Sequence, residues 1–376
     1  MGGVYIHVPF CKQACYYCDF HFSVNTTQQD ELVDQIAREL ELQKDYLQEP
    51  VQTIYLGGGT PSLLTTSQLE KILNTVYKHF SVDSLPEITL EANPDDLSVE
   101  KLTALKQSGV NRLSIGIQTF QPELLRLLNR AHSVADAHRC VEAARQAGIN
   151  NLSIDLMFGL PGQTNSLLEA DLATALQVNP PHISLYSLTI EKKTVFGNWA
   201  RKGKLQQVNE PEAARQFELV METLDAAGYL QYEISNYCRS GYESKHNSSY
   251  WQRKKYLGVG PSAHSFNGNT RQFNIRNNAR YLQQLKQGVI PFELEVLTPE
   301  NKINEYILTT LRTAAGCNLG FLLNEFGFNL LTAHPAAIQQ MLAQQQITLD
   351  GGLLKLTRAG KLIADTLAAE LFALEK

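Results

Sequence analysis

Features that mark membrane, secreted and nucleic-acid-binding proteins are missing from this chain of 376 residues. No apolar run approaches the roughly 20 residues that a membrane-spanning helix needs. The first residues lead directly into a strand-like segment, without the basic and apolar regions of a secretory signal peptide. The formal net charge is only -5, which gives no general attraction to nucleic acid or anionic membranes. We therefore expect a cytoplasmic protein that does not bind nucleic acid.

Cysteine is scarce, and half of it is concentrated in one short loop. Of six cysteines, Cys140, Cys238 and Cys317 are scattered, and we expect them to be small buried hydrophobic residues. The remaining three have the spacing C-x3-C-x2-C, at Cys11, Cys15 and Cys18. A reducing cytoplasm keeps such thiols free, so the loop is predicted to bind metal rather than to form disulfides.

The ligand set of this loop leaves two kinds of metal open. Three thiolates facing one centre suit a 4Fe-4S cluster, in which one iron would keep an open position for another ligand. Alternatively, His21 could complete the Cys3His set of a structural zinc site.

Strand-like and helix-like segments alternate through the first half of the chain. The strands are predicted at 4–8, 52–56, 87–91, 112–117, 152–158 and 183–188, and the helices at 31–46, 67–80, 99–107, 135–146 and 166–177. Apolar strands separated by amphipathic helices favour parallel strands with right-handed crossovers. The predicted fold class is therefore α/β, with a partial (β/α)6 barrel.

Polar and glycine residues gather at the carboxyl ends of these strands. They are His7, Gly58, Gly59, Thr60, Glu91, Gln118, Asp155 and the turn Gly159-Leu160-Pro161-Gly162. In barrel enzymes this end builds the active site, although glycine, proline and aspartate are also ordinary turn residues. Their joint position at one rim favours a functional site.

The chain as a whole is predicted to divide into three parts. We predict a barrel over 1–195, an extension over 196–295 and a small winged-helix-like domain over 296–376, in which a hairpin at 347–356 interrupts the helices. The extension holds a helix at 212–226, a strand at 232–237 and the motif H-N-x-x-Y-W from His246 to Trp251. The run Arg253-Lys254-Lys255 is expected on solvated surface.

Several ordered motifs carry a resemblance to a known family. They are Tyr5-x-His7-x-Pro9-Phe10-Cys11, Gly57-Gly58-Gly59-Thr60-Pro61, Glu91-x-Asn93-Pro94, Gln118-x-Phe120, Arg130-x-His132 and Asp155-x-x-x-Gly159-x-Pro161. With the cysteine loop, and with Tyr17 before its last cysteine, this series resembles the radical S-adenosylmethionine superfamily. Within it, the series is similar to the branch of oxygen-independent coproporphyrinogen III dehydrogenases.

This resemblance implies cofactors and the residues that bind them. The three cysteines would bind a 4Fe-4S cluster whose open iron binds S-adenosylmethionine. By similarity, Tyr5, Gly58 and Glu91 would hold this first cofactor molecule. A second cofactor position in that branch matches Gly59, Thr60, Gln118, Arg130 and Asp155. For Arg130, an ordinary surface ion pair is an alternative.

Two departures separate the chain from the dehydrogenases. The dehydrogenases resemble the pattern C-x3-C-x2-C-x-C, whereas this chain has Phe20 at the position of the last cysteine. The dehydrogenases also carry a substrate-contacting extension before the first strand, whereas only four residues precede Tyr5 here. Phe20 together with the H-N-x-x-Y-W motif resembles the heme chaperones of the same family. His246 could then ligate heme iron while Tyr250 and Trp251 pack on the macrocycle; the alternative is a structural histidine among core aromatics.

The expected function is therefore a heme carrier with a 4Fe-4S cluster and S-adenosylmethionine. It would deliver heme to apo-hemoprotein acceptors such as respiratory-chain proteins, and a homodimer or peripheral membrane association through a partner would be compatible with that role. No catalytic residue is assigned, and dehydrogenase activity is not expected. Oxidative decarboxylation of coproporphyrinogen III is the alternative, and another radical modification such as methyl transfer is a third.

Overall fold

A computed structural model describes residues 2–374, and one curved sheet of twelve strands dominates it. Its central strands follow the order of the chain, and each one pairs with the next in parallel. They are β1 (Gly2–Val8), β2 (Val51–Gly58), β3 (Val82–Ala92), β4 (Arg112–Gln118), β5 (Asn151–Phe158) and β6 (His182–Ser187). All six coincide with predicted strands, so the α/β barrel architecture is confirmed.

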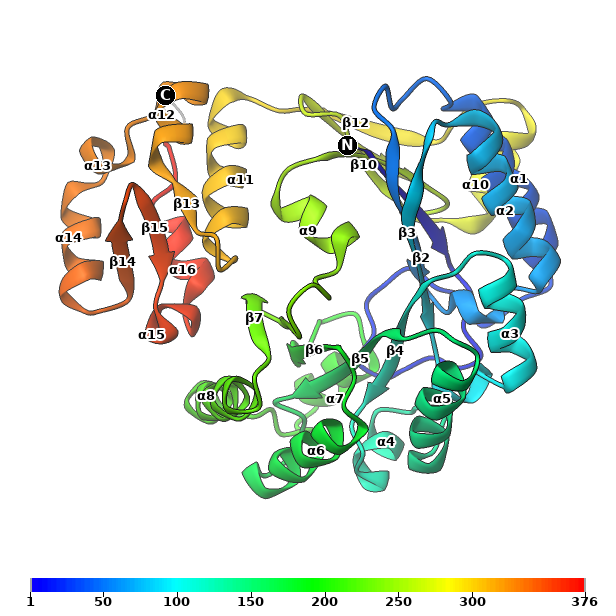
Figure 1. The fold of residues 1–376 in the computed structure, drawn as a ribbon, viewed down its shortest axis with the longest axis horizontal. Helices are drawn as coiled ribbons and strands as arrows, with labels where there is room; N and C mark the ends of the chain where they lie inside the picture. The colour runs from blue at the N-terminus through cyan, green and yellow to red at the C-terminus, as the bar shows by residue number, and fades with distance from the viewer. Residues whose placement is uncertain (1, 375–376) are drawn as a thin grey trace.

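The helices between these strands cover the outer side of the sheet (Figure 1). They are α1 (Gln29–Leu42), α2 (Thr66–His79), α3 (Val99–Gln107), α4 (Pro122–Leu127), α5 (Val134–Gln146) and α6 (Asn165–Val178), with 3-10 turns η1 (Pro61–Leu63) and η2 (Pro94–Asp96). Capping boxes at Thr65 and Ser133 start α2 and α5. Because helices cover the outer face of the sheet and side chains in the barrel interior cover the inner face, β1 and β2 are buried almost throughout.

The extension adds strands to both edges of the same sheet. Next to β1 lie β9 (Lys255–Val259), β10 (His264–Phe266), β11 (Thr270–Asn274) and β12 (Phe292–Val296), and beyond β6 lie β8 (Asn236–Cys238) and β7 (Leu230–Glu233). The β9 strand is parallel to β1. The single strand predicted at 232–237 is wrong, because a turn at 234–235 splits it into β7 and β8.

One helix of the extension lies on the inner side of the curved sheet (Figure 1). This helix, α9 (Lys245–Trp251), carries the H-N-x-x-Y-W motif and contacts β2. The other helices of the extension are α7 (Val195–Arg201), α8 (Glu210–Ala226) and α10 (Asn278–Lys286). The helix α9 therefore fills part of the barrel interior.

The C-terminal unit has a hydrophobic core of its own, around Ile307, Leu322 and Leu354. Its elements are α11 (Pro299–Leu311), β13 (Cys317–Asn318), α12 (Leu319–Phe326), α13 (Leu330–Ala333), α14 (Pro335–Ala343), β14 (Ile347–Asp350), β15 (Leu353–Leu356), α15 (Arg358–Lys361) and α16 (Ala364–Ala369). The hairpin β14–β15 lies where the sequence predicted it. The boundaries at 195 and 295 remain predictions, since strands of the extension complete the barrel sheet.

Within residues 2–374, no helix combines the length and the apolar character needed to cross a membrane.

Candidate functional site

The cysteine loop leaves the carboxyl end of β1 and returns beside its own start. The amide of Cys11 donates to the carbonyl of Ser23 (3.0 Å), and that of Ser23 donates to Pro9 (2.7 Å). Phe10 is buried beneath this closure. The far side is held where the amide of Tyr16 donates to Leu128 (3.2 Å). The loop is thus fixed at both ends over the rim of the barrel.

Two side chains, one from the segment after β2 and one from the loop between α4 and α5, donate hydrogen bonds to the cysteine sulfurs. The Thr60 hydroxyl lies 3.4 Å from Cys11 Sγ, and Arg130 Nη1 lies 3.2 Å from Cys15 Sγ. Burial raises the pKa of Cys18 to about 11, and burial also raises the pKa of Cys11. Hydrogen bonds to sulfur favour the thiolate form that metals bind, so Thr60 and Arg130 are suited to support bound thiolates.

The zinc alternative is not supported by the placement of His21. Its Nε2 atom lies 2.6 Å from Asn278 Oδ1, on α10. Among residues 2–374, no group of three or more His, Cys, Asp or Glu side chains is placed to bind a single metal ion. The compact Cys3His arrangement that zinc requires is therefore not assembled in the described part of the chain.

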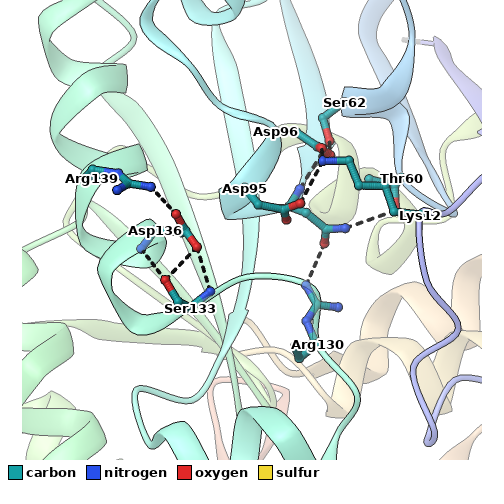
Figure 2. A network of polar contacts seen from close by, with 10 residues as sticks. Lys12, Thr60, Ser62, Asp95, Asp96, Arg130, Ser133, Asp136 and Arg139 are labelled. Atoms are coloured by element: carbon teal, nitrogen blue, oxygen red, sulfur yellow. Dashed lines mark hydrogen bonds and ion pairs between the residues drawn. The ribbon is translucent and has the colours of Figure 1, made fainter.

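An ion-pair network fastens the cysteine loop to the segment after β3 (Figure 2). The Lys12 amine lies 2.7 Å from Asp95 Oδ2 and also pairs with Asp96. The Ser62 hydroxyl donates to Asp96 at 2.6 Å. On the other side, Arg130 Nη2 donates to Asn93 Oδ1 at 2.6 Å. The loop between Cys11 and Cys15 is therefore tied to the segments after β2 and β3 and, through Arg130, to the loop between α4 and α5.

The glycine run at positions 57–59, at the end of β2, allows the chain to pass close to its neighbours. A Cβ atom on Gly58, whose φ is +107°, would lie 2.5 Å from the His7 ring. A Cβ atom on Gly59 would lie 2.7 Å from the Phe10 carbonyl oxygen. The Gly58 amide donates to Glu91 Oε2 at 3.1 Å. Only glycine fits this approach, so the run brings backbone amides to the rim beside the cysteine loop.

Acidic side chains from β3 and β5 face the barrel interior. Glu91 accepts a hydrogen bond from Tyr55 Oη at 2.8 Å, and burial raises its pKa to about 7. Asp155 accepts from the Ser114 hydroxyl at 3.0 Å, and burial raises its pKa as well. Tyr5 stacks on Tyr55, with ring centroids 6.1 Å apart. Carboxylates held in this way can accept hydrogen bonds from hydroxyl or amine groups of a ligand.

One cavity of about 1000 Å³ brings the predicted residues together. It is lined by Tyr5, Cys11, Cys15, Tyr17, Cys18, Gly58, Gly59, Thr60, Glu91, Gln118, Arg130 and Asp155. Gln118 adopts a left-handed backbone conformation (φ 71°) at the end of β4. Arg130 forms no ion pair with a described residue, and its Nε atom lacks a hydrogen-bond partner there. The surface ion pair considered for Arg130 is therefore not what the structure shows.

Of the residues predicted to bind a cofactor, His246 does not line this cavity, and the predicted rim turn at 159–162 lies outside it as well. His246 is 1% exposed, with Nδ1 at 2.7 Å from Thr53 Oγ1 and Nε2 at 2.8 Å from Tyr250 Oη. Its amide donates to Glu87 at 3.0 Å, and burial, followed by the charge of Arg112, lowers its pKa to about 3. To ligate heme iron, His246 would have to give up a hydrogen bond and leave the core. Its assignment as a heme ligand thus gains no support from the geometry and remains a prediction.

Residues of β9 to β11 and of the segment after β11 also line the cavity, and no role was predicted for them from the sequence. They include Tyr256, His264, Phe266, Arg271 and Arg276. The glycine-rich segment before His264 was a detectable signal, but β10 and β11 are short and polar, so their pairing beyond β9 could not be expected. The site is therefore larger than predicted.

Comparisons with known proteins agree with this arrangement. The family model of the Radical SAM superfamily matches residues 5–175, and that of the HemN C-terminal domain matches residues 297–363. Among solved structures, coproporphyrinogen III oxidase (HemN) from Escherichia coli, a radical SAM enzyme, has a TM-score of 0.85 at 21% identity. That match covers 99% of this chain and 90% of HemN, and it shows the shared fold.

Curated relatives are similar over most of the chain. The chain is 38% identical to the heme chaperone HemW of Bacillus subtilis, over 97% of both proteins. It is 38% identical to HemW of Escherichia coli, over 70% of this chain and 69% of that protein. A mitochondrial radical S-adenosyl methionine domain-containing protein of Danio rerio is 37% identical, over 70% of this chain and 60% of that protein. With its barrel, its cysteine loop and its C-terminal unit, this chain belongs to the HemW family of the radical SAM superfamily.

Proposed function

We propose that this protein is a heme chaperone, which binds heme and transfers it to apo-hemoproteins in the cytoplasm. The observation that carries the proposal is the 38% identity to the Bacillus subtilis heme chaperone, which extends over 97% of both chains. Acceptors such as respiratory-chain proteins, a homodimer and membrane association through a partner belong to the same proposal.

The cysteine loop would hold a 4Fe-4S cluster through Cys11, Cys15 and Cys18. Three thiols that open on one cavity, with hydrogen-bond donors at two of the sulfurs, support this assignment. A bound cluster of this kind supplies single electrons, and its iron without a cysteine accepts a further ligand. In this chain Thr60 and Arg130 would support the thiolates, while Lys12 would hold the loop in place.

S-adenosylmethionine would occupy the part of the cavity that is lined by the cysteine loop and by the ends of the barrel strands. Tyr5, Gly58 and Glu91 would bind a first molecule, and Gly59, Thr60, Gln118, Arg130 and Asp155 match a second position. The unpaired Nε atom of Arg130 supports a ligand there, because a buried donor without a partner is costly. The carboxylates of Glu91 and Asp155 are suited to the cofactor's amine or ribose hydroxyl groups.

A decisive experiment compares heme handling with porphyrin chemistry on one sample. The full chain is reconstituted anaerobically with iron and sulfide and then divided. One half is tested for hemin binding and for hemin transfer to an apo-hemoprotein. The other is tested for consumption of coproporphyrinogen III with reductant and S-adenosylmethionine. We expect transfer without consumption.

Consumption of coproporphyrinogen III without transfer of hemin would instead assign the chain to the dehydrogenases, in agreement with the fold that it shares with HemN. The Cys15→Ser variant is the control for the cluster. It should lose the brown chromophore, and retention of the chromophore would contradict the assigned ligand set.

A further inference from the structure

The cavity is also lined by residues from the end of α9 and from the β9–β11 edge of the sheet. We call this part of the lining its outer half; it comprises Tyr250, Trp251, Lys254, Tyr256, His264, Phe266, Arg271 and Arg276. It combines aromatic rings with basic side chains. Such a surface suits a large planar ligand that carries carboxylates, since the rings provide apolar contact and arginine binds carboxylates.

Three histidines line the cavity, and two of them are held by hydrogen bonds. His7 is bonded through both ring nitrogens, to Tyr5 Oη (3.1 Å) and to the His21 carbonyl (2.9 Å). His21 is bonded to Asn278. The ring of His264 forms no hydrogen bond with any residue from 2 to 374 and is exposed to the cavity. Its one ring contact is with the edge of Phe273, at 4.7 Å between centroids.

The backbone that carries His264 is rigidly held. The amide of Asn274 donates to the Ala263 carbonyl (2.8 Å), and the Ser265 hydroxyl bonds the amide of Gly258 (2.9 Å). Ala263 and Ser265, on either side of His264, are both buried. The imidazole therefore projects from a fixed point of β10, as a metal ligand requires.

The charges around His264 favour its neutral form. Partial burial of the ring within the cavity, followed by the charges of Arg271 and Arg276, lowers the pKa of His264 below its ordinary value. A neutral imidazole keeps the lone pair that binds iron. Arg271 is anchored by Glu305, through an Nε–Oε1 bond of 2.8 Å. Arg276 donates a hydrogen bond to the Asp19 carbonyl oxygen and pairs with the Asp19 carboxylate at 3.9 Å, and its side chain is still 51% exposed. The exposed part of the Arg276 guanidinium can face a propionate.

We propose that His264 is the iron ligand of heme bound in the outer half of this cavity, with Arg276 facing a propionate group. This inference rests on the proposed function. His264, which is open to the cavity, is a better candidate for the iron ligand than His246, which is buried and has both ring nitrogens hydrogen-bonded.

The test is a hemin titration of the cluster-loaded full chain, followed by resonance Raman spectroscopy of the reduced complex. We expect the wild type to show an iron–imidazole stretch. His264→Ala should lose it and bind hemin about tenfold or more weakly. The matched control is His138→Ala, since His138 is also exposed and contacts a phenylalanine ring (Phe120, 5.4 Å) but lies outside the cavity. This control should keep both properties.

Imidazole added to His264→Gly should restore the stretch, which a purely structural role for His264 would not produce. Retention of the stretch in His264→Ala would overturn the inference while leaving the proposed function intact. Failure of the wild type to bind hemin at all would overturn the proposed function instead.

Discussion

Gly58 shows how a single residue shapes the rim of the barrel. Its backbone has φ +107°, and a Cβ atom there would lie 2.5 Å from both Cε1 and Nδ1 of His7. His7 cannot move freely, since its ring is bonded to Tyr5 and to the backbone of the cysteine loop at His21. Glycine is therefore required at position 58 because of the positive φ and because the His7 ring leaves no room for a Cβ atom.

We predict that Gly58→Ala destabilises the protein and displaces the cysteine loop. The backbone strain alone costs about 1–3 kcal/mol, and the contact with His7 adds to it. Anaerobic urea unfolding and the iron content after reconstitution would measure both effects. Gly148→Ala is the matched control, because Gly148 also has positive φ (78°) but no atom within 4 Å of its Cβ position. Equal losses in the two variants, with full iron content in both, would contradict the prediction.

At the scale of elements, Glu39 joins α1 to the segments that hold His264. This residue is fully buried, and four donors bind its carboxylate. They are Gln43 Nε2 (3.0 Å), the Gly260 amide (2.8 Å), Asn274 Nδ2 (2.7 Å) and Tyr281 Oη (2.5 Å). A single side chain therefore connects α1, the turn before β10, the end of β11 and α10.

The ionisation of Glu39 is predicted to make stability depend on pH. Burial raises its pKa from 4.5 to about 7, so the folded state binds the proton more tightly than the unfolded state. As pH rises from 4.5 to about 7, this group alone lowers the free energy of unfolding by up to about 3 kcal/mol. Glu39→Gln stays neutral and lacks this loss, although its amide accepts fewer hydrogen bonds.

The free energy of unfolding, measured with urea at about pH 5 and at about pH 8, would test this dependence. The difference in unfolding free energy between Glu39→Gln and the wild type should shift in favour of the variant as pH rises. Glu41→Gln, on the same helix with a 46% exposed side chain, is the control and should show no such shift. A pH-independent difference for Glu39→Gln would contradict the pKa assigned to Glu39.

At the scale of the whole molecule, the barrel and the C-terminal unit meet around Arg253. The sequence predicted this residue on solvated surface, but its side chain is only 14% exposed. Its Nη1 atom donates to the Lys302 carbonyl at 2.9 Å, and its guanidinium lies over Phe266 and Phe326. A cavity of about 1140 Å³ lies at the same junction. Because the interface is not closely packed throughout, Arg253 is an important connection between the two cores.

We predict that Arg253→Ala loosens the C-terminal unit without loss of the cysteine loop. Hydrogen exchange in α11 and α12 should become about tenfold faster, which corresponds to about 1.4 kcal/mol of local stability. The control is Lys255→Ala, since Lys255 pairs with Glu49 at 2.6 Å and lines neither of the two larger cavities. Unchanged exchange in α11, or equal acceleration in the control, would argue against this role of Arg253.

Local patterns in the sequence predicted the barrel strands and most of its helices well. They failed for 255–296, because β9 to β12 are short and are held by pairing in sequence outward from β1, with β9 on β1 and each later strand on the one before it. Short elements depend on their tertiary neighbours, which local propensity does not contain.

The sequence by itself determined the cysteine loop, the six-strand alternation and the rim residues, because spacing and periodicity are local properties of the chain. Only the tertiary structure decided which histidine is available. His246 belongs to a conspicuous motif, yet α9 places it in the barrel interior, where Thr53 and Tyr250 bind its ring. His264 gave little local signal, yet β10 presents it to the cavity. Burial and hydrogen bonding of a side chain depend on segments far apart in the sequence, so the fold alone could distinguish them.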